Sequence, residues 1–308
     1  MIDTGIVKVL LVEDDEDDFV ITRDLLAELP GRRYTLDWIK TCKAGLETMC
    51  LNQHDVVLVD YLLGAENGID LLRAALKHGC QSPIILLTGA GQHRVDVEAM
   101  EAGAADYLVK SQLRPDSLER TIRYAAQRKR AAAQAAFEQA RLAAFGSEIG
   151  LALTRRDSLE GILERCAQAM AQYLNAGLAQ VLTYDAQNRV LEPRAAAGPA
   201  WQAGSPRHSL PQAWLDPDLL AQGKPVLINQ LLAEERIPDQ EWVKRSGMAG
   251  YAAYPLVLEE QLVGLMAIFT QHPLTEHIHQ EMGSVANGIA LCIERKRSEE
   301  ALDASEDK

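Results

Sequence analysis

Five short apolar segments in the first 110 residues constrain the fold of this chain more than any other feature. Each is rich in leucine or β-branched residues and has the length of a strand. The predicted strands are Val7–Val12, Tyr34–Ile39, Val56–Asp60, Ile84–Thr88 and Ala105–Val109, and helical patterns lie between them at Phe19–Leu29, Ala44–Leu51, Ile69–His78 and His93–Ala102. This alternation predicts an α/β fold, a five-stranded parallel sheet with helices on both faces. Such doubly wound sheets bind ligands outside the carboxyl ends of their strands.

Polar residues stand at or just after the end of four of these five segments. The first segment runs into Glu13 and Asp14, the third ends in Asp60, the fourth ends in Thr88, and Lys110 follows the fifth. Three carboxylates that converge on one edge of a sheet stay ionised at high cost unless a cation joins them. Oxygen ligands suit Mg²⁺. With an ammonium and a hydroxyl beside it, such a site has what an aspartyl phosphate needs, and Asp60 is then the nucleophile.

The run VEDDEDDFV holds six consecutive acids, and the sequence divides them into two groups. Glu13 and Asp14 come directly after a buried strand, so they are the candidate ligands. The other acids, Asp15 to Asp18, fall in the turn and the first turn of the next helix, where negative charge is favourable. We expect these four to be solvated or to cap the helix, with Asp17 or Asp18 as the cap.

The first 125 or so residues resemble a response-regulator receiver domain of two-component signalling, which has a flavodoxin-like fold. The matching motifs are VEDD after the first strand, VLVDYLLG, LLTG and DYLVK. The resemblance implies that Asp60 is the phosphoacceptor and that Glu13 and Asp14 form the acidic pair, with Asp14 the more direct Mg²⁺ ligand. It also implies that Asp60 and the main-chain carbonyl of Leu62 complete the protein ligands of the metal.

The same resemblance assigns the remaining residues of the site. Thr88 and Tyr107 match the switch pair that reorients on phosphorylation, and Lys110 matches the phosphate-binding lysine. The chain departs from the family at Ser111, where receivers commonly have proline after a cis peptide bond. A cis bond without proline costs about 3 kcal/mol, so the loop after Lys110 is expected to be trans or strained.

A long helical segment follows, from Pro115 to about Gly146, without internal glycine or proline. Apolar residues recur along it at a spacing of three to four, many of them alanine, which predicts one continuous helix and a weak coiled-coil seam. The expected organisation is a receiver domain over 1–125, a linker helix over 126–145, a second domain over 146–296 and a charged helical tail over 297–308.

The second half mixes helices with strands in consecutive blocks, which predicts an α+β domain with an antiparallel sheet. The predicted strands are Ala179–Tyr184, Val190–Ala195, Pro225–Ile228, Ala252–Val257 and Leu262–Phe269, the last two forming a hairpin around Glu259 to Gln261. A helix is predicted over Leu159–Leu174, and a final helix carries Ile278, Met282 and Ile289 on one face.

Residues from about 141 to 296 resemble a GAF domain of the kind found in sensor kinases and multi-domain regulators. The matching stretches include FGSEIGLALTRRDSLEGILERCAQAM and MAGYAAYPLVLEEQLVGLMAIF. The resemblance implies either a small-molecule sensor or a dimerising relay. The ligand stays unknown, because Asn229 to Leu231 do not supply the constellation of cyclic-nucleotide binders, and Cys166 and Cys292 are expected to be buried structural residues rather than bilin attachment sites.

Other residues of this half leave two interpretations open. The aromatic side chains could line a pocket or simply pack, and they are Trp201, Trp214, Trp242, Tyr251 and Tyr254. His277 and His279 form an HxH pair without a third ligand and are expected at the surface.

Composition excludes several classes of partner. The net charge is −13 and both halves are acidic, so nucleic acid is not expected as a partner. The five cysteines are scattered without a CxxC pair, which is typical of reduced thiols in the cytoplasm. No apolar run approaches the roughly 20 residues that span a bilayer, so no membrane association is expected.

The predicted function is phosphorylation-dependent signalling without turnover of an external substrate. A sensor histidine kinase or phosphotransfer protein would phosphorylate Asp60, and the long helix would relay the change to the GAF module in a homodimer formed through the linker and C-terminal helices. One alternative is a GAF sensor with an inactive receiver. Another is an aspartyl-phosphate phosphatase, against which Leu62 argues, because such enzymes place a second aspartate there. The charged tail leaves two alternatives, a stand-alone receiver–GAF adaptor or the N-terminal part of a longer kinase, hybrid sensor kinase or cyclase, and we favour the second.

Overall fold

The computed structural model describes residues 6–29, 34–89, 93–200, 220, 222–234 and 240–306. Two compact units make up the chain, residues 1–136 and 137–308. Among the helices of the described ranges, none combines the length and the apolar character that crossing a membrane requires.

The first unit is built on a five-stranded parallel sheet, as the sequence predicted. Its strands are ordered β2-β1-β3-β6-β7. Their bounds are Tyr34–Ile39 for β2, Val7–Val12 for β1, Val56–Asp60 for β3, Ile84–Thr88 for β6 and Asp106–Val109 for β7. The strand order changes direction between β1 and β3, so the carboxyl ends of these two strands frame the switch point where ligands bind in such folds. A short antiparallel pair that the sequence did not predict, β4 (Leu62–Leu63) with β5 (Glu66–Asn67), follows β3.

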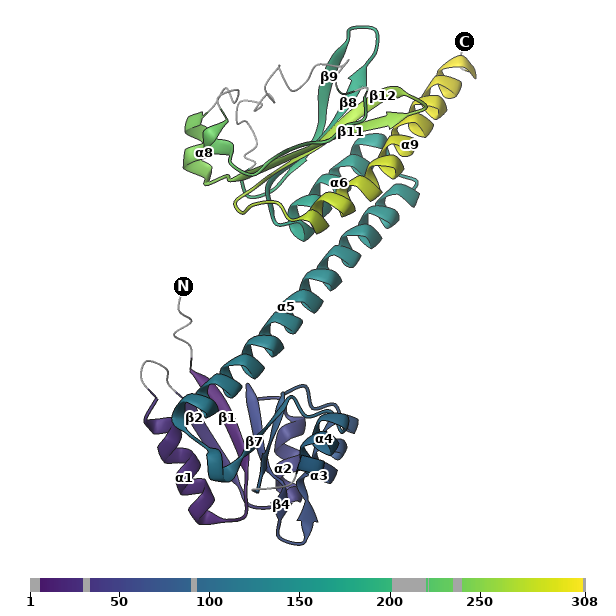
Figure 1. The fold of residues 1–308 in the computed structure, drawn as a ribbon. Helices are drawn as coiled ribbons and strands as arrows, with labels where there is room; N and C mark the ends of the chain where they lie inside the picture. Colours follow the sequence, from purple (N-terminus) through teal and green to yellow (C-terminus); the bar gives the residue numbers. More distant parts are fainter. Residues whose placement is uncertain are drawn as a thin grey trace. The chain divides into compact units, whose positions relative to one another are not determined.

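Helices cover both faces of this sheet (Figure 1). Helices α1 (Glu16–Ala27) and the start of α5 (Pro115–Thr154) pack on one face, around Val9, Leu58 and Ile122. The other face is covered by helices α2 (Cys42–Cys50), α3 (Gly68–Lys77) and α4 (His93–Glu101). A 3₁₀ turn, η1 (Lys110–Gln112), links β7 to the segment before α5. The sequence predicted all of these α-helices, with ends displaced by a few residues.

Helix α1 begins at Glu16, ahead of the predicted Phe19, because Asp15 is its N-cap. One side-chain oxygen of Asp15 accepts hydrogen bonds from the main-chain N–H groups of Asp17 (2.8 Å) and Asp18 (3.4 Å). The prediction that Asp17 or Asp18 caps the helix was therefore wrong. Only two residues separate the end of β1 from the cap, which holds the start of α1 close to the edge of the sheet.

The second unit contains an antiparallel sheet with the strand order β10-β11-β12-β8-β9, which confirms the predicted α+β class. The strands are β8 (Ala176–Asp185), β9 (Val190–Ala197), β10 (Val226–Ile228), β11 (Gly250–Leu258) and β12 (Gln261–Thr270). Strands β11 and β12 form the predicted hairpin, whose turn residues Glu259 and Glu260 have φ angles of 47° and 64°. Positive φ at both turn positions matches the right-handed twist of the two strands.

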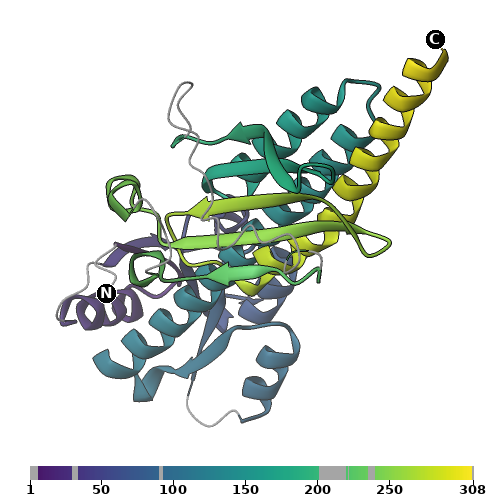
Figure 2. The same cartoon turned by 90° about the horizontal axis from the view of Figure 1, so that it is seen from above.

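Helices pack on one face of this sheet (Figure 2). They are α6 (Leu159–Tyr173), α9 (Glu276–Glu306) and the last turns of α5, and their apolar side chains interlock with those of β8, β11 and β12. The opposite face packs against α8 (Gln240–Ser246) and the 3₁₀ turn η3 (Leu231–Ala233).

Helix α5 contributes side chains to both cores. Leu118 and Ile122 are fully buried in the first unit, and Phe145 and Ile149 are buried in the second. The helix ends at Thr154 and passes through Gly146, near which the sequence predicted its end. Gly150 also lies inside the helix, and each glycine costs about 1 kcal/mol, which the burial of Phe145 and Ile149 offsets.

Candidate functional site

Three carboxylates and one ammonium meet at the carboxyl edge of the parallel sheet. The carboxyl groups of Glu13, Asp14 and Asp60 each offer an oxygen within 4.8 Å of the others. Glu13 and Asp60 are buried, 1% and 6% exposed, whereas Asp14 is exposed to solvent. The sequence predicted this convergence, which follows from β1 and β3 being neighbours in a parallel sheet.

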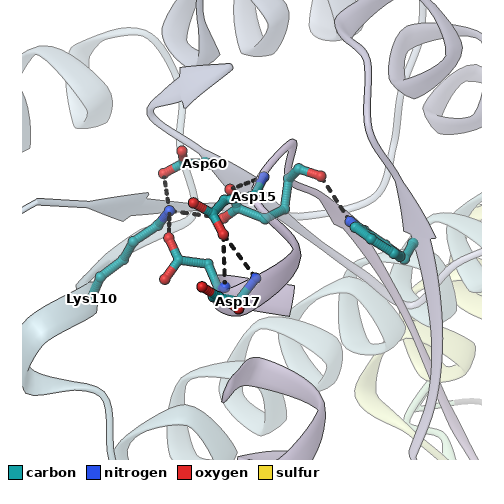
Figure 3. A network of polar contacts seen from close by, with 7 residues as sticks. Asp15, Asp17, Asp60 and Lys110 are labelled. Carbon is teal, nitrogen blue, oxygen red and sulfur yellow. Dashed lines mark hydrogen bonds and ion pairs between the residues drawn. The ribbon is translucent and has the colours of Figure 1, made fainter. Parts of the chain in front are cut away.

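The Lys110 ammonium joins this group from the end of β7 (Figure 3). Its Nζ lies 2.8 Å from Glu13 Oε2, 2.8 Å from Asp60 Oδ1 and 2.6 Å from Asp18 Oδ2. An ammonium has three N–H donors, and here each has a carboxylate acceptor. Lys110 is therefore saturated with charge-assisted hydrogen bonds, which are stronger than neutral ones.

Asp18 belongs to this network, although we expected it to be solvated or to act as a cap. It stands one helical turn beyond the cap Asp15, and its side chain is 36% exposed at the rim of the site. The charge run alone did not reveal this contact, because nothing in the local sequence shows which acid of the first helical turn faces Lys110.

The shifted pKa values have clear physical causes. Burial raises the pKa of Glu13 from its usual 4.5 to about 7, a rise that the Lys110 hydrogen bond opposes. Burial likewise raises the pKa of Asp60. Burial alone would lower the pKa of Lys110, but the hydrogen bonds to Asp18, Asp60 and Glu13 outweigh it, so that the pKa is raised.

Glu13 is held on its main-chain side by a tryptophan that the sequence analysis did not single out. The indole Nε1 of Trp38 donates to the Glu13 carbonyl oxygen at 2.7 Å, and the Glu13 N–H donates to the Ile39 oxygen at 2.9 Å. The Trp38 ring stacks on Phe19 of α1 with ring centroids 4.0 Å apart. These contacts fix the end of β1 against β2 and α1, and so limit the positions that the Glu13 carboxylate can take.

The loop after Asp60 is held close by Gly68, another residue that the sequence analysis missed. The Gly68 N–H donates to the Tyr61 oxygen at 2.8 Å, and a Cβ at this position would overlap the main-chain oxygen of Asp60. Only glycine allows this approach. Leu62 follows in β4 and is 61% exposed.

Thr88 and Tyr107, the predicted switch pair, lie on the neighbouring strands β6 and β7. Thr88 is completely buried, and its Oγ1 has no hydrogen-bond partner among the described residues. Such an orphaned hydroxyl is uncommon in a folded protein and needs a reason. Tyr107 is half-buried and packs against the core on the α4 side of the sheet.

The loop that follows Lys110 contains Ser111 within η1. Every peptide bond in the described part of the chain is trans, including the one before Ser111. Of the two expected forms of this loop, trans or strained, the structure has the trans form. Lys110 reaches the carboxylates without a cis peptide bond.

Comparison with known families agrees with this geometry. The model of the response regulator receiver domain matches residues 9–123, and that of the GAF domain matches residues 156–294. The chain carries a receiver domain followed by a GAF domain. The two resemblances noted in the sequence are thus confirmed.

The receiver domain is also similar to curated relatives. Over 103 residues it is 33% identical to protein RcaC of Microchaete diplosiphon, covering 33% of this chain and 15% of that protein. It is 31% identical over 103 residues to the two-component response regulator PhoP of Pseudomonas aeruginosa, covering 33% of this chain and 44% of that protein. The chain therefore matches less than half the length of either relative. Receiver homologues are response regulators of two-component signalling, which are not classical enzymes.

Solved structures resemble each domain separately. The GAF domain of A. aeolicus nlh2 in an inactive state covers 52% of this chain and 99% of that chain, with a TM-score of 0.42 and 13% identity. The receiver domain of sensor histidine kinase PA1611 from Pseudomonas aeruginosa, solved with a magnesium ion in its active site cleft, covers 40% of this chain and 99% of that chain, with a TM-score of 0.36 and 22% identity.

The acidic group of this receiver domain fits a hard divalent cation. Glu13, Asp14 and Asp60 offer only oxygen atoms, and the exposed Asp14 leaves the group open to water on one side. Mg²⁺ prefers such ligands because it keeps several of its waters. Burial raises the pKa values of Glu13 and Asp60 although the Lys110 hydrogen bonds lower them, so a bound cation would favour the ionised carboxylates.

The raised pKa of Glu13 predicts a pH dependence of stability in the absence of metal. Between pH 4.5 and about 7 the folded protein binds this proton and the unfolded chain does not, so the free energy of unfolding falls as pH rises. We expect a loss on the order of 2 kcal/mol across this window. Urea unfolding in chelator at pH 5 and pH 8 measures it. The variant Glu13→Gln should have a smaller slope, keeping the part that the raised pKa of Asp60 contributes, and an unchanged slope in the variant would contradict the assignment.

The cysteines of the GAF domain have the structural environment that the sequence predicted. Cys166 is completely buried on α6, and Cys292 is 4% exposed on α9. Burial raises the pKa of the Cys166 thiol to about 12, so it stays protonated. A protonated thiol in the core is a poor nucleophile.

The described aromatic residues of the GAF domain pack within it. Tyr251 is completely buried and Trp242 meets Phe269 edge-on, with ring centroids 5.2 Å apart. Trp201 and Trp214 lie outside the described residues. Of the two histidines, His277 is exposed, as predicted, whereas His279 is half-buried and hydrogen-bonds through Nδ1 to the Tyr254 hydroxyl.

Asn229, which we compared with cyclic-nucleotide binders, has a structural role. Its Oδ1 accepts from the Leu274 N–H at 2.6 Å and its Nδ2 donates to the Leu274 oxygen at 3.3 Å. This pair of bonds joins the segment after β10 to the segment before α9. Its side-chain amide is thus already engaged within the protein.

Proposed function

We propose that the receiver domain accepts a phosphoryl group on Asp60 from a sensor histidine kinase or a phosphotransfer protein. The observation that carries this proposal is the position of Asp60. It is a buried carboxylate at the end of β3, in contact with Lys110 and within one small group with Glu13 and Asp14. A carboxylate at the switch point of a parallel sheet, beside a fixed ammonium, is placed for nucleophilic attack.

The proposed reaction transfers one phosphoryl group from a phosphohistidine to Asp60. A carboxylate oxygen of Asp60 attacks the phosphorus of a phosphohistidine, the new P–O bond forms as the P–N bond breaks, and the leaving imidazole takes its proton from solvent. Lys110 turns one N–H from Asp60 to a phosphoryl oxygen. Mg²⁺, held by Glu13, Asp14, Asp60 and the main-chain carbonyl of Leu62, would neutralise charge on the phosphoryl oxygens. The unpartnered Thr88 hydroxyl would donate to one of them and so find its missing acceptor.

We propose that reorientation of Thr88 on phosphorylation affects helix α5 through the segment that joins β7 to α5. Thr88 pairs in register with Val109, the residue before η1, and α5 begins three residues after η1 ends, at Pro115. Movement of Thr88 together with Tyr107 would therefore shift the β7–α5 segment. Helix α5 then carries the change toward the GAF domain, because its residues belong to both cores.

Lys129 anchors α5 to the receiver core at the opposite end of the sheet. Its Nζ donates to the His54 carbonyl oxygen at 2.8 Å and to Ser82 Oγ at 3.1 Å. The next residue, Arg130, forms an ion pair of 3.4 Å with Asp55. This anchor makes α5 a rigid extension of the receiver domain at least as far as these residues.

Replacing Lys129 by methionine should loosen this anchor. We expect the free energy of unfolding of the first unit to fall by about 1–2 kcal/mol, since a charge-assisted hydrogen bond to a half-buried carbonyl is lost. Amide hydrogen exchange should quicken selectively over residues 127–136. Arg128→Met removes the same charge from an exposed neighbour and serves as the control. Equal effects of the two variants would argue against an anchoring role.

We further propose that the GAF domain acts as a small-molecule sensor or a dimerising relay within a homodimer. Large apolar side chains on the long helices support the dimer, since Phe137 of α5 is 65% exposed, and Leu291 and Leu302 of α9 are 55% and 63% exposed. Helices with exposed apolar positions of this size commonly bury them against a second helix.

Titration of the wild-type protein with beryllofluoride in the presence of Mg²⁺ tests the phosphoacceptor proposal. Beryllofluoride mimics a phosphoryl group on a carboxylate, so the amide resonances of Thr88, Tyr107 and Lys110 should shift. Asp60→Ala should abolish these shifts. A wild-type protein that does not respond, or an Asp60→Ala variant that responds equally, would refute the proposal and leave the GAF domain as the only candidate sensor.

A further inference from the structure

The three carboxylate partners of Lys110 are not equivalent. Glu13 and Asp60 belong to the group of oxygens that fits a metal ion, and Asp18 does not. Asp18 Oδ2 is nevertheless the nearest of the three oxygens, at 2.6 Å from the Lys110 Nζ. Lys110 thus has one carboxylate partner that stands outside the candidate metal group.

The fold places Asp18 at the rim of the site. The Asp15 side chain accepts from the Asp18 N–H and so fixes the first turn of α1. From there the Asp18 side chain, 36% exposed, reaches Lys110, whereas the side chains of Glu13 and Asp60 are 1% and 9% exposed. Lys110 therefore lies between two buried carboxylates and one that borders solvent.

We propose that Asp18 is a positioning residue that holds Lys110 toward the entrance of the site while Asp60 is phosphorylated. The inference rests on the proposed function of Asp60 as phosphoacceptor. Phosphorylation removes the charge of the Asp60 carboxylate that Lys110 contacts, and a cation beside Glu13 competes for the charge of that second partner. Asp18 keeps its full charge in both events, so it is the partner whose hold on Lys110 neither event weakens.

A lysine without this partner would be poorly placed. The lysine side chain is a flexible four-carbon chain with a compact charge, and it takes its position from its partners. With Asp18 present, two N–H groups of Lys110 stay on Asp18 and Glu13, and the third is free to turn from Asp60 to a phosphoryl oxygen. With Asp18 absent, the ammonium has lost the contact at the entrance side, where the phosphoryl group arrives.

The first test observes the lysine itself, without metal or phosphoryl analogue. A lysine ammonium held in three ion pairs exchanges its protons slowly and gives a resolved ¹H–¹⁵N signal in protein labelled with ¹⁵N-lysine. Lys110→Arg assigns this signal in the wild-type protein. We expect the signal to be lost in Asp18→Ala and broadened in Asp18→Asn, and to persist in Asp17→Asn. Asp17 provides a matched control because it lies in the same helical turn and is exposed. A signal that persists in both Asp18 variants would overturn the inference.

The second test measures beryllofluoride affinity at saturating Mg²⁺ by the amide shifts. We expect the dissociation constant to rise about tenfold in Asp18→Ala, less in Asp18→Asn and not at all in Asp17→Asn. Equal or tighter binding in the Asp18 variants, with a normal wild-type response, would overturn the positioning role and leave the phosphoacceptor intact. A wild-type protein that binds no beryllofluoride would overturn both proposals.

Discussion

Replacing Asp60 by asparagine should abolish covalent phosphorylation of the receiver domain. The amide keeps the size of the side chain but has no nucleophilic carboxylate, so no phosphoryl group can be transferred to it. Incubation with a small-molecule phosphodonor and Mg²⁺, followed by intact-protein mass spectrometry, should show one added phosphoryl group on the wild-type protein and none on the variant. The fold should persist, because burial already raises the pKa of Asp60 and a neutral group is tolerated at this position.

Asp70→Asn is the matched control for this experiment. Asp70 lies on α3 in the same domain, and its side chain is 73% exposed and paired only with Arg73 among the described contacts. It should be phosphorylated as the wild type is. Phosphorylation that persists in Asp60→Asn would place the acceptor elsewhere, and loss in both variants would point to a general effect of charge.

Replacing Lys110 by methionine should have the largest effect on stability. It leaves the carboxylates of Glu13 and Asp60, 1% and 9% exposed, without their ammonium. Breaking a buried ion pair on one side costs about 3–5 kcal/mol, so the metal-free variant should be destabilised by about 3 kcal/mol at pH 8. Beryllofluoride binding should be weakened as well, because the ammonium that contacts the acceptor is gone.

The pH dependence distinguishes this cause from a packing defect. Without Lys110 the carboxyl pKa values rise further, so the folded variant takes up protons that the unfolded chain binds only at lower pH. The loss in free energy of unfolding of Lys110→Met relative to the wild type should therefore be smaller at pH 5 than at pH 8. Urea unfolding in chelator measures both values. Lys77→Met, which removes an exposed lysine at the end of α3, should show no such difference. A deficit in Lys110→Met that is equal at both pH values would indicate lost packing instead.

Much of the candidate site follows from the sequence because strands and their ends are local features. The apolar runs that end at Val12 and Asp60 predict buried strands, and a parallel sheet brings their ends to one edge. Lys110 reaches the same edge for the same reason. The motifs around these residues then identified the family, since several chemically related positions matched together.

The residues that the sequence analysis missed or misassigned act through contacts between elements. Trp38 and Gly68 support Glu13 and Asp60 from a neighbouring strand and from the start of α3. Neither residue shows this role in its local pattern. The cap of α1 was misplaced because Asp15, Asp17 and Asp18 are all suitable caps, and only the distance from the end of β1 selects among them.

For the GAF domain the sequence indicated the class of the sheet and the burial of Cys166 and Cys292. It left open whether its aromatic residues pack or line a pocket. The structure shows Tyr251 and Trp242 packed around Phe269. Packing of this kind depends on side chains from several strands and helices, which periodicity along one segment cannot specify.

The sequence by itself determined the alternation of elements, the parallel sheet of the receiver domain and the identity of the acids and the lysine at its edge. Tertiary structure alone decided that Asp18, one of six consecutive acids, contacts Lys110 while its neighbour Asp17 stays exposed. The physical reason is that periodicity and local charge specify a helix and its first turn. The direction in which one side chain of that turn points depends on how the helix packs against the strands.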